Sequence, residues 1–252
     1  MEECSPMKIV WNKNSINWFK EASAYTGYNR RLSSFLMEYI PHRNTICDMG
    51  CGAALIDFEF AKQFKQVTCV DISQEAISSV DASIKEQNIS NIRTVCMDGT
   101  MFNDSSDTVI ALFHGGPNIF DNYYPLAKEQ LIIVTHLGKC GTFSPEKHRK
   151  AHNFGVPKTK EHLEKLGVKY TYLEQSLEYG QPFHTFDDAM EFMNAYSAPG
   201  MTEEEKIENL KNRLIETGEQ EYPYYLPNKK EMGIFIINRK ENKQIGGTTC
   251  TY

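Results

Sequence analysis

Residues 46–55 read Ile46-Cys47-Asp48-Met49-Gly50-Cys51-Gly52-Ala53-Ala54-Leu55, an apolar run that leads into two glycines separated by one residue. Glycines at such a point let the backbone turn sharply and approach a ligand without obstruction by a Cβ atom. Asp71 ends the next apolar run, 23 positions after Asp48. A carboxylate at that place in a parallel sheet accepts hydrogen bonds from ribose hydroxyls. The segment therefore predicts a strand, a glycine turn, a helix and a second strand that together bind a ligand carrying a ribose.

The sequence on both sides of this segment alternates strand-like and helical patterns from about residue 45 to residue 138. Apolar runs at 46–48, 67–71, 92–97, 108–113 and 131–136 are nearly continuous, which is typical of strands buried on both faces of a parallel sheet. Between the first two runs Ile56, Phe60 and Phe64 recur at helical spacing, and Ser73 is placed to cap the next helix. The alternation predicts an α/β fold with a doubly wound, mostly parallel sheet and helices on both faces.

Residues 9–40 are a predicted helical region that breaks at Gly27 and is ended by Pro41. Trp11, Trp18 and Tyr25 recur every seven residues, and Tyr28 joins the same helical face. One interpretation is that these rings pack the helices onto the rest of the domain. The other is that they form a wall of a ligand pocket.

The pattern changes after residue 138. A helix is predicted over 158–166, with strands at 168–173 and 232–238. Between these strands lies an insertion at about 181–229. We predict it to be helical, because Thr185 with Asp188 and Thr202 with Glu205 are placed as capping boxes. Residues 244–252 are predicted to be an unstructured tail.

Composition limits the classes of protein to which the chain can belong. It has 252 residues, 40% of them apolar, and a formal net charge of −6, which suits one α/β domain with a sizeable core. No apolar run approaches the roughly 20 residues that span a bilayer, and the start is acidic, so we predict neither a membrane span nor a secretory signal. Seven scattered cysteines fit reduced thiols in the cytoplasm. The negative charge disfavours nucleic acid as a partner.

The motif Asp48-x-Gly50-Cys51-Gly52 resembles the signature of class I S-adenosylmethionine-dependent methyltransferases, whose first strand typically ends in D/E-x-G-x-G-x-G. Further family positions match Asp71, which closes the second strand, Asp98, which follows the third, and the segments 107–114 and 232–238. Ala54 stands where the family usually has its third glycine, and a positive φ there would disfavour alanine. The resemblance implies a sheet of seven strands with S-adenosylmethionine over the carboxyl ends of strands one to four.

The resemblance also implies which residues bind the cofactor. Cys51 and its two glycine neighbours would let the backbone approach the amino-acid half, Asp71 would accept the ribose hydroxyls, and Ile72 with Met97 would enclose the adenine. For Asp98, ordinary turn chemistry before Gly99 is the alternative to binding the adenine edge. The predicted cofactor site comprises Asp48, Gly50, Cys51, Gly52, Asp71, Ile72, Met97, Asp98, Gly99 and Phe113.

His114, at the end of the fourth predicted strand, is the candidate general base. The family places that strand end near the methyl group, and histidine titrates near neutrality. A histidine that only caps the strand is the alternative. The segment His-Gly-Gly-Pro at 114–117 lacks the N/D-P-P-Y/F motif of enzymes that methylate nucleobase amino groups. His148 and His152 lie among Lys and Arg residues, so we predict a solvated basic turn there and no metal site.

We predict a cytoplasmic methyltransferase that acts on an oxygen, nitrogen or carbon of a small molecule. Trp11, Trp18, Tyr25 and Tyr28 are its predicted substrate-binding residues. The chain would be a single domain over 1–252, with an N-terminal helical cap at 1–44, a cofactor-binding core at 45–138 and an acceptor-side half at 139–240. The alternatives are an NAD-dependent oxidoreductase of similar fold and a binding protein that retains the cofactor site without catalysis. The sequence leaves the oligomeric state open.

Overall fold

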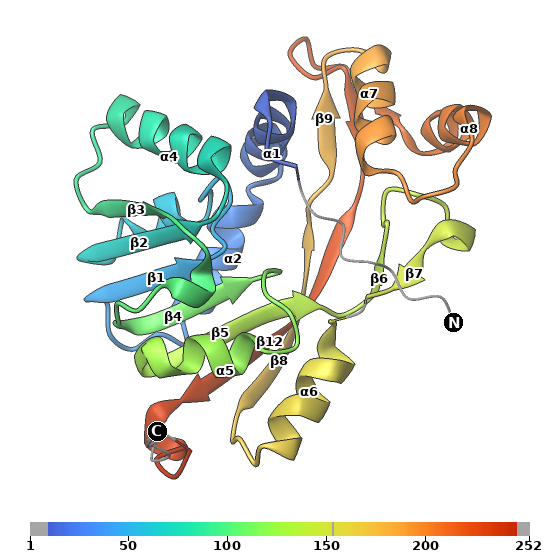
Figure 1. The fold of residues 1–252 in the computed structure, drawn as a ribbon. Coiled ribbons are helices and arrows are strands. Elements are labelled where there is room, and N and C mark those ends of the chain that lie inside the picture. The colour runs from blue at the N-terminus through green and yellow to red at the C-terminus, as the bar shows by residue number, and fades with distance from the viewer. Residues whose placement is uncertain (1–9, 153, 246–252) are drawn as a thin grey trace.

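The computed structural model describes residues 10–152 and 154–245 (Figure 1). The predicted tail at 244–252 therefore lies almost entirely outside the described residues. None of the helices within the described ranges is both long enough and apolar enough to cross a membrane.

Seven strands form one large sheet, in the spatial order β3-β2-β1-β4-β5-β12-β8. Strands β1 to β5 are parallel, and β12 runs antiparallel to both of its neighbours, β5 and β8. The strands span Thr45–Met49 (β1), Gln66–Asp71 (β2), Ile92–Cys96 (β3), Ser106–Leu112 (β4), Ala127–His136 (β5), Thr171–Glu178 (β8) and Lys229–Asn238 (β12). The predicted mostly parallel sheet and its late antiparallel strand are confirmed.

Helices cover both faces of this sheet (Figure 1). The helices α2 (Tyr28–Met37), α3 (Asp57–Phe60) and α4 (Gln74–Glu86) share one buried cluster with the sheet, whereas α5 (Ile119–Tyr123) and α6 (Val156–Lys165) share the other. Ile46 belongs to the first cluster and Cys47 to the second, and neither is exposed. Burial on both faces explains why the strand sequences are hydrophobic without alternation. Short 3₁₀ helices lie at Gly99–Met101 (η1), Tyr124–Leu126 (η2), Glu146–His148 (η3) and Arg239–Glu241 (η4).

Two local predictions are corrected. The pattern of Ile56, Phe60 and Phe64 predicted a full helix, but α3 is a single turn, because the chain must enter β2 at Gln66. The strand predicted at 168–173 begins at Thr171 instead. The N–H of Val168 donates to the carbonyl of Leu163, and this bond closes the end of α6.

The N-terminal region is two helices, α1 (Lys13–Thr26) and α2, separated at Gly27 as predicted. Gly27 has φ +64°, a left-handed conformation that ends α1. Asn12 and Ser15 form a capping box at the start of α1. Figure 1 shows α1 between the large sheet and strand β9 of the insertion, and α1 contacts β9.

The insertion is not wholly helical, which corrects the prediction for 181–229. Its two helices, α7 (Phe186–Tyr196) and α8 (Glu203–Arg213), begin at the two predicted capping boxes. They pack on a three-stranded antiparallel sheet of β9 (Gln181–Phe183), β10 (Ile215–Glu216) and β11 (Tyr224–Leu226). Strands of two or three residues carry too little pattern to be recognised in a sequence. A short hairpin of β6 (Lys139–Cys140) and β7 (Lys150–Ala151) precedes α6.

Candidate functional site

The chain reverses between β1 and α3 through residues with left-handed backbone angles, and we call this segment, residues 50–54, the glycine turn. The angle φ is +77° at Gly50, +55° at Gly52 and +53° at Ala54. The N–H groups of Gly50 and Cys51 donate to the carbonyl of Val70 at 2.8 and 3.1 Å, which fixes the turn to β2. A left-handed L-residue costs about 1–2 kcal/mol. Ala54 therefore adopts, with this strain, a conformation that the glycine usual in the resembled family would adopt without it.

Two aromatic rings pack directly on the glycine turn. A Cβ atom added at Gly50 would overlap the ring of His114, and one added at Gly52 would overlap the indole of Trp11. The indole also packs against Phe19 of α1, with ring centroids 5.1 Å apart. Because the two glycines have no side chains, the end of β4 and the N-terminal segment reach the turn.

The carboxylate of Asp71 lies beside the glycine turn at the end of β2. Its Oδ2 accepts a hydrogen bond from the N–H of Gly52 and its Oδ1 accepts one from the N–H of Ser73, both at 2.8 Å. Each oxygen has a second lone pair with which to accept a further hydrogen bond. The next side chain, Ile72, is 66% exposed. A fixed carboxylate and an open apolar surface thus stand next to each other.

Met97 and Asp98 follow β3 and adjoin the same region, because the N–H of Met97 donates to the carbonyl of Asp71 at 2.9 Å. The Oδ1 of Asp98 accepts hydrogen bonds from the N–H and the hydroxyl of Thr100, at 2.9 and 2.8 Å. These bonds lower the pKa of Asp98. These contacts are those of an ordinary turn, which was the alternative interpretation of Asp98. The side chain of Asp98 is also exposed, next to Gly99.

His114 connects the glycine turn to α5. Its Nε2 lies 3.1 Å from the hydroxyl oxygen of Tyr123, and the two rings are stacked. Burial lowers the pKa of His114, although the charges of Asp71 and Asp98 act in the opposite direction. The imidazole is therefore neutral at pH 7, which is the form that accepts a proton.

Asp48 lies beneath the glycine turn, and sequence reasoning missed its neighbour Asp57 on α3. They are 2% and 0% exposed. Burial raises the pKa of both carboxyls, and the charge of Asp48 adds to the rise at Asp57. The sequence placed Asp48 among the residues that contact the cofactor, and this stays a prediction for a side chain that is 2% exposed. The missed signal is the spacing of Asp57, three residues before the buried Phe60 on one helix face.

The four predicted substrate residues do not form one wall. Trp18 packs on Phe192 and Tyr196 of α7, at 5.4 and 5.8 Å between ring centroids, and Tyr25 packs on Tyr222 and Tyr225, at 5.8 and 4.9 Å. These contacts join α1 to the insertion, as the simpler interpretation of the aromatic stripe expected. Trp11 instead lies on the glycine turn, and Tyr28 is buried against Tyr179, at 4.2 Å between centroids.

A second cluster, not predicted from the sequence, surrounds the end of β4. The Nζ atom of Lys230 lies 3.7 Å from the ring centroid of Phe113. Phe113 also packs on His136, at 4.7 Å between ring centroids, and its φ is +54°. The usable signal was alternation along β12, which puts Lys230 on the same strand face as the buried Met232 and Ile234.

The segment 148–152 forms no α-helix, in agreement with the predicted basic turn, but His152 is half-buried where the prediction expected it to be solvated. His148 and His152 do not share a helix, because η3 ends at His148 and a strand follows. His148 lies 3.2 Å from a carboxylate oxygen of Glu205. His152 is stacked on His136, with ring centroids 3.7 Å apart and planes within 4°. Among the residues that the structure describes, no group of three or more His, Cys, Asp or Glu side chains is arranged to hold a metal ion.

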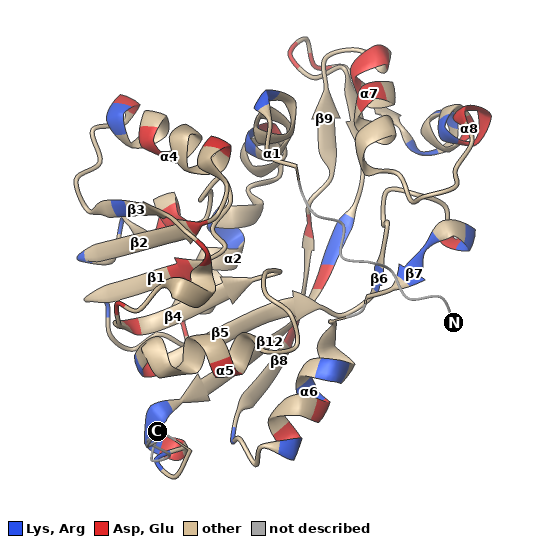
Figure 2. Ribbon diagram, viewed as in Figure 1, with Lys and Arg blue, Asp and Glu red and all other residues tan. Residues whose placement is uncertain are grey.

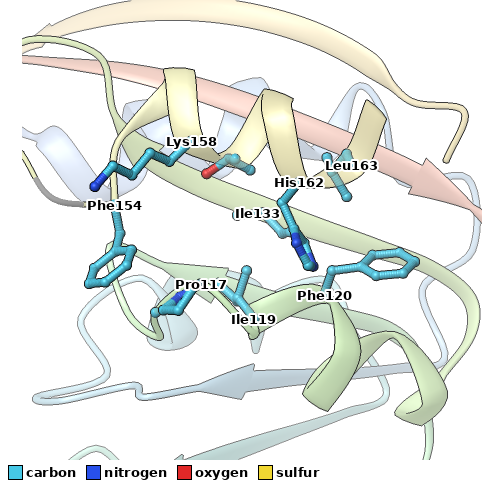
Figure 3. Close-up of a pocket in the computed structure, with 10 residues that line it drawn as sticks. Pro117, Ile119, Phe120, Ile133, Phe154, Lys158, His162 and Leu163 are labelled. Atoms are coloured by element: carbon cyan, nitrogen blue, oxygen red, sulfur yellow. The ribbon is translucent and has the colours of Figure 1, made fainter. Parts of the chain in front are cut away.

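A small pocket lies between α5 and α6, on the opposite face of the sheet from α2 (Figure 3). Pro117, Ile119 and Phe120 line one side, and Phe154 and Lys158 reach it from the other. Its lining is mainly apolar and contains none of the predicted site residues. We therefore place the candidate site at the carboxyl ends of β1 to β4 and not in this pocket.

Comparisons with known proteins give a family match over part of the chain and several solved structures of similar fold. Residues 46–124 match the family model described as a methyltransferase domain. No curated protein sequence matches the chain. Similar solved structures include the YcgJ protein of Bacillus subtilis, at 11% identity over 82% of this chain and 98% of that chain with a TM-score of 0.51. A putative methyltransferase of Bacillus halodurans C-125 has 15% identity over 82% and 98%, with a TM-score of 0.50.

Another similar structure is magnesium protoporphyrin IX methyltransferase of Synechocystis PCC 6803 with bound SAH, at 13% identity over 90% of this chain and 89% of that chain, with a TM-score of 0.50. At these identities the structural likeness concerns the fold, and the sequence match concerns residues 46–124. The chain therefore contains, over residues 46–124, a match to a methyltransferase domain, and its large sheet has the fold that these solved structures share.

Proposed function

We propose that this chain is a class I S-adenosylmethionine-dependent methyltransferase and that it methylates a small organic acceptor held at the carboxyl end of β4. The observation that carries the proposal is the group of aromatic rings at this strand end. Phe113 lies under Lys230, whose ammonium group is also within 6 Å of the ring centroids of Tyr28 and Tyr179. The next residue, His114, packs on the glycine turn. A largely aromatic lining of this kind suits a small molecule.

The residues at the glycine turn fit the adenosyl part of the cofactor. Asp71 is oriented by two backbone N–H groups and has lone pairs left for ribose hydroxyls. Ile72 offers an apolar surface for the adenine, since it is 66% exposed. Met97 is joined to the end of β2 by its bond to the carbonyl of Asp71, and Asp98 with the Gly99 amide would bind the adenine edge. The turn would let the amino-acid half approach the backbone at Gly50, Cys51 and Gly52.

The cofactor supplies an activated methyl group, so the chain mainly has to position the acceptor and exclude water. Holding the acceptor atom about 3–3.5 Å from the methyl carbon supplies much of the rate enhancement. For a hydroxyl acceptor, neutral His114 would take the proton at a ring nitrogen. The hydroxyl of Tyr123, 3.1 Å from Nε2, would hold the imidazole in place.

Charge favours a small acceptor over a nucleic acid. The chain has a net charge of −6, and Figure 2 shows Lys and Arg scattered over the elements and interspersed with Asp and Glu. Nucleic-acid enzymes usually present a continuous basic surface. A cytoplasmic location fits the five described cysteines, which are all free thiols.

Calorimetry and a transfer assay test the proposal together. We expect S-adenosylhomocysteine to bind tightly and NAD not to bind. We also expect tritium from S-adenosyl-[methyl-³H]methionine to appear in the small-molecule fraction of a cell extract. Binding of NAD in place of S-adenosylhomocysteine would support a dehydrogenase. Label only in RNA would refute a small acceptor, and cofactor binding without any labelled product would support a non-catalytic binding protein.

A further inference from the structure

Lys230 is a cation surrounded by aromatic rings. It is the second residue of β12, where Figure 2 shows a basic segment at the start of the strand. Its Nζ atom lies 3.7 Å from the ring centroid of Phe113, 5.3 Å from that of Tyr179 and 5.7 Å from that of Tyr28. No carboxylate of the described residues forms an ion pair with it. The rings stabilise the ammonium group in part, but they do not replace a counterion.

The neighbouring basic groups do not provide that counterion either. His136 packs on Phe113 and is stacked on His152, so both imidazoles lie beside the ammonium group. Burial and the charge of Lys230 lower the pKa of His152 to about 4 and hold that of His136 far below its usual range. Burial lowers the pKa of Lys230 to about 8. At pH 7 the cluster therefore contains two neutral imidazoles and one ammonium group that is mainly charged.

A second polar group in the cluster also has no partner. Tyr28 is only 3% exposed, and its buried hydroxyl forms no hydrogen bond with any described residue. A buried hydroxyl without a partner is unfavourable. The ammonium group lies 5.7 Å from the centroid of the ring that bears this hydroxyl. An uncompensated cation and an unused hydroxyl both favour a ligand that accepts hydrogen bonds and bears a negative charge.

We propose that the methyl acceptor is a small carboxylic acid whose carboxylate binds the ammonium group of Lys230 and the hydroxyl of Tyr28. This inference rests on the proposed function, because it uses the same acceptor site. A monoanion fits better than a phosphate dianion, since one ammonium group supplies the only formal charge among the six residues of the cluster. The rings of Phe113 and Tyr179 would pack on the apolar part of the acid, and the atom that is methylated would lie elsewhere on the molecule.

Benzoate is the probe, with benzamide as its uncharged control. We expect benzoate to bind to the 252-residue chain at pH 7 and benzamide to bind at least tenfold more weakly. Lys230→Met should weaken benzoate binding tenfold or more, and Lys230→Arg should retain most of it. Lys229→Met is the matched control, because Lys229 is exposed and alternates to the other face of β12. Equal benzoate affinity of wild type and Lys230→Met, or equal affinity for benzoate and benzamide, would overturn the inference. So would failure of benzoate to bind.

S-Adenosylhomocysteine binding separates this inference from the proposed function. Lys230→Met should bind S-adenosylhomocysteine like wild type, which also shows that the variant is folded. If wild type does not bind S-adenosylhomocysteine, the proposed function is refuted. The comparison of benzoate binding would still decide the role of Lys230. In the transfer assay the labelled product should be retained on an anion-exchange resin, because it keeps its carboxylate. A labelled product that is not retained would overturn the inference.

Discussion

Replacing Gly50 with alanine tests whether the glycine turn is shaped by the close approach of His114. Gly50 has φ +77°, and the Cβ atom of an alanine would overlap three ring atoms of His114. Gly218 provides a matched control. It has the same φ of +77°, and no atom lies within 4 Å of an added Cβ. The two substitutions therefore share the backbone strain and differ in the contact.

The expected magnitudes follow from this comparison. Left-handed φ costs an L-residue about 1–2 kcal/mol, and the reduced freedom of the unfolded chain returns about 0.4–1 kcal/mol. Gly218→Ala should therefore lower the free energy of unfolding by about 1 kcal/mol. Gly50→Ala adds the overlap with His114, and overpacking of this kind costs about 1–3 kcal/mol. Its total loss should be about 2–4 kcal/mol.

Urea denaturation measures both losses, and calorimetry with S-adenosylhomocysteine measures the effect on the turn. Gly218→Ala should bind the ligand like wild type, whereas Gly50→Ala should bind it at least tenfold more weakly. The double variant Gly50→Ala/His114→Ala should recover the part of the loss that comes from the overlap, because the ring is gone. Equal stability losses for the two single variants, with unchanged binding in both, would refute the reasoning.

Three further substitutions test other parts of the site. Burial raises the pKa of Asp48 and Asp57. Above about pH 4 the folded state therefore keeps a proton that the unfolded chain has lost. The free energy of unfolding falls as the pH rises from there through the folded pKa values. Asp57→Asn should make this fall smaller, as measured by urea midpoints at pH 5 and pH 8, and an unchanged fall would contradict it. Ile72→Ala should weaken S-adenosylhomocysteine binding roughly fivefold, because the bound ligand would cover part of this side chain and the lost contact is worth about 1 kcal/mol of binding free energy. Ile215→Ala is the control, because Ile215 is 49% exposed, and it should leave the binding unchanged. Ala54→Val should lower the free energy of unfolding by at least about 2 kcal/mol, because a β-branched residue is strained at φ +53°, and an unfolding curve like that of wild type would exclude such strain.

The fold was predictable where its signal is local. The apolar run at 46–48, the glycines at 50 and 52 and the carboxylate at 71 lie within one strand, turn and strand, so short-range sequence was sufficient to locate them. The capping boxes of α7 and α8 were found for the same reason, since Thr185 with Asp188 and Thr202 with Glu205 act within one turn of chain. Local chemistry fixes these elements before any tertiary contact is known.

The residues that sequence reasoning missed depend on pairing between distant strands. Lys230 lies near Phe113 and Tyr179, in the proposed acceptor site, because β12 pairs between β5 and β8. A lysine at the start of a strand is usually exposed to solvent. Likewise, His152 was predicted from its Lys and Arg neighbours to be solvated, but it stacks on His136 across the strand end. Register in the sheet, which the sequence does not state, decides both cases.

The end of β4 joins the proposed cofactor and acceptor sites through two consecutive residues. Phe113 faces Lys230, and His114 packs on Gly50. Successive residues of an extended strand point in opposite directions, but Phe113 has φ +54°, so the chain leaves the strand geometry at this residue. Its N–H still donates to the carbonyl of Val134 at 2.8 Å, which ties the left-handed residue to β5. Such strain costs of order 1–3 kcal/mol and persists only where the surrounding structure fixes it. We infer that the bend at Phe113 sets the distance between the methyl group and the acceptor. A shift of about 1 Å in that distance lowers the rate roughly 100-fold, which would outweigh the cost of the strained backbone.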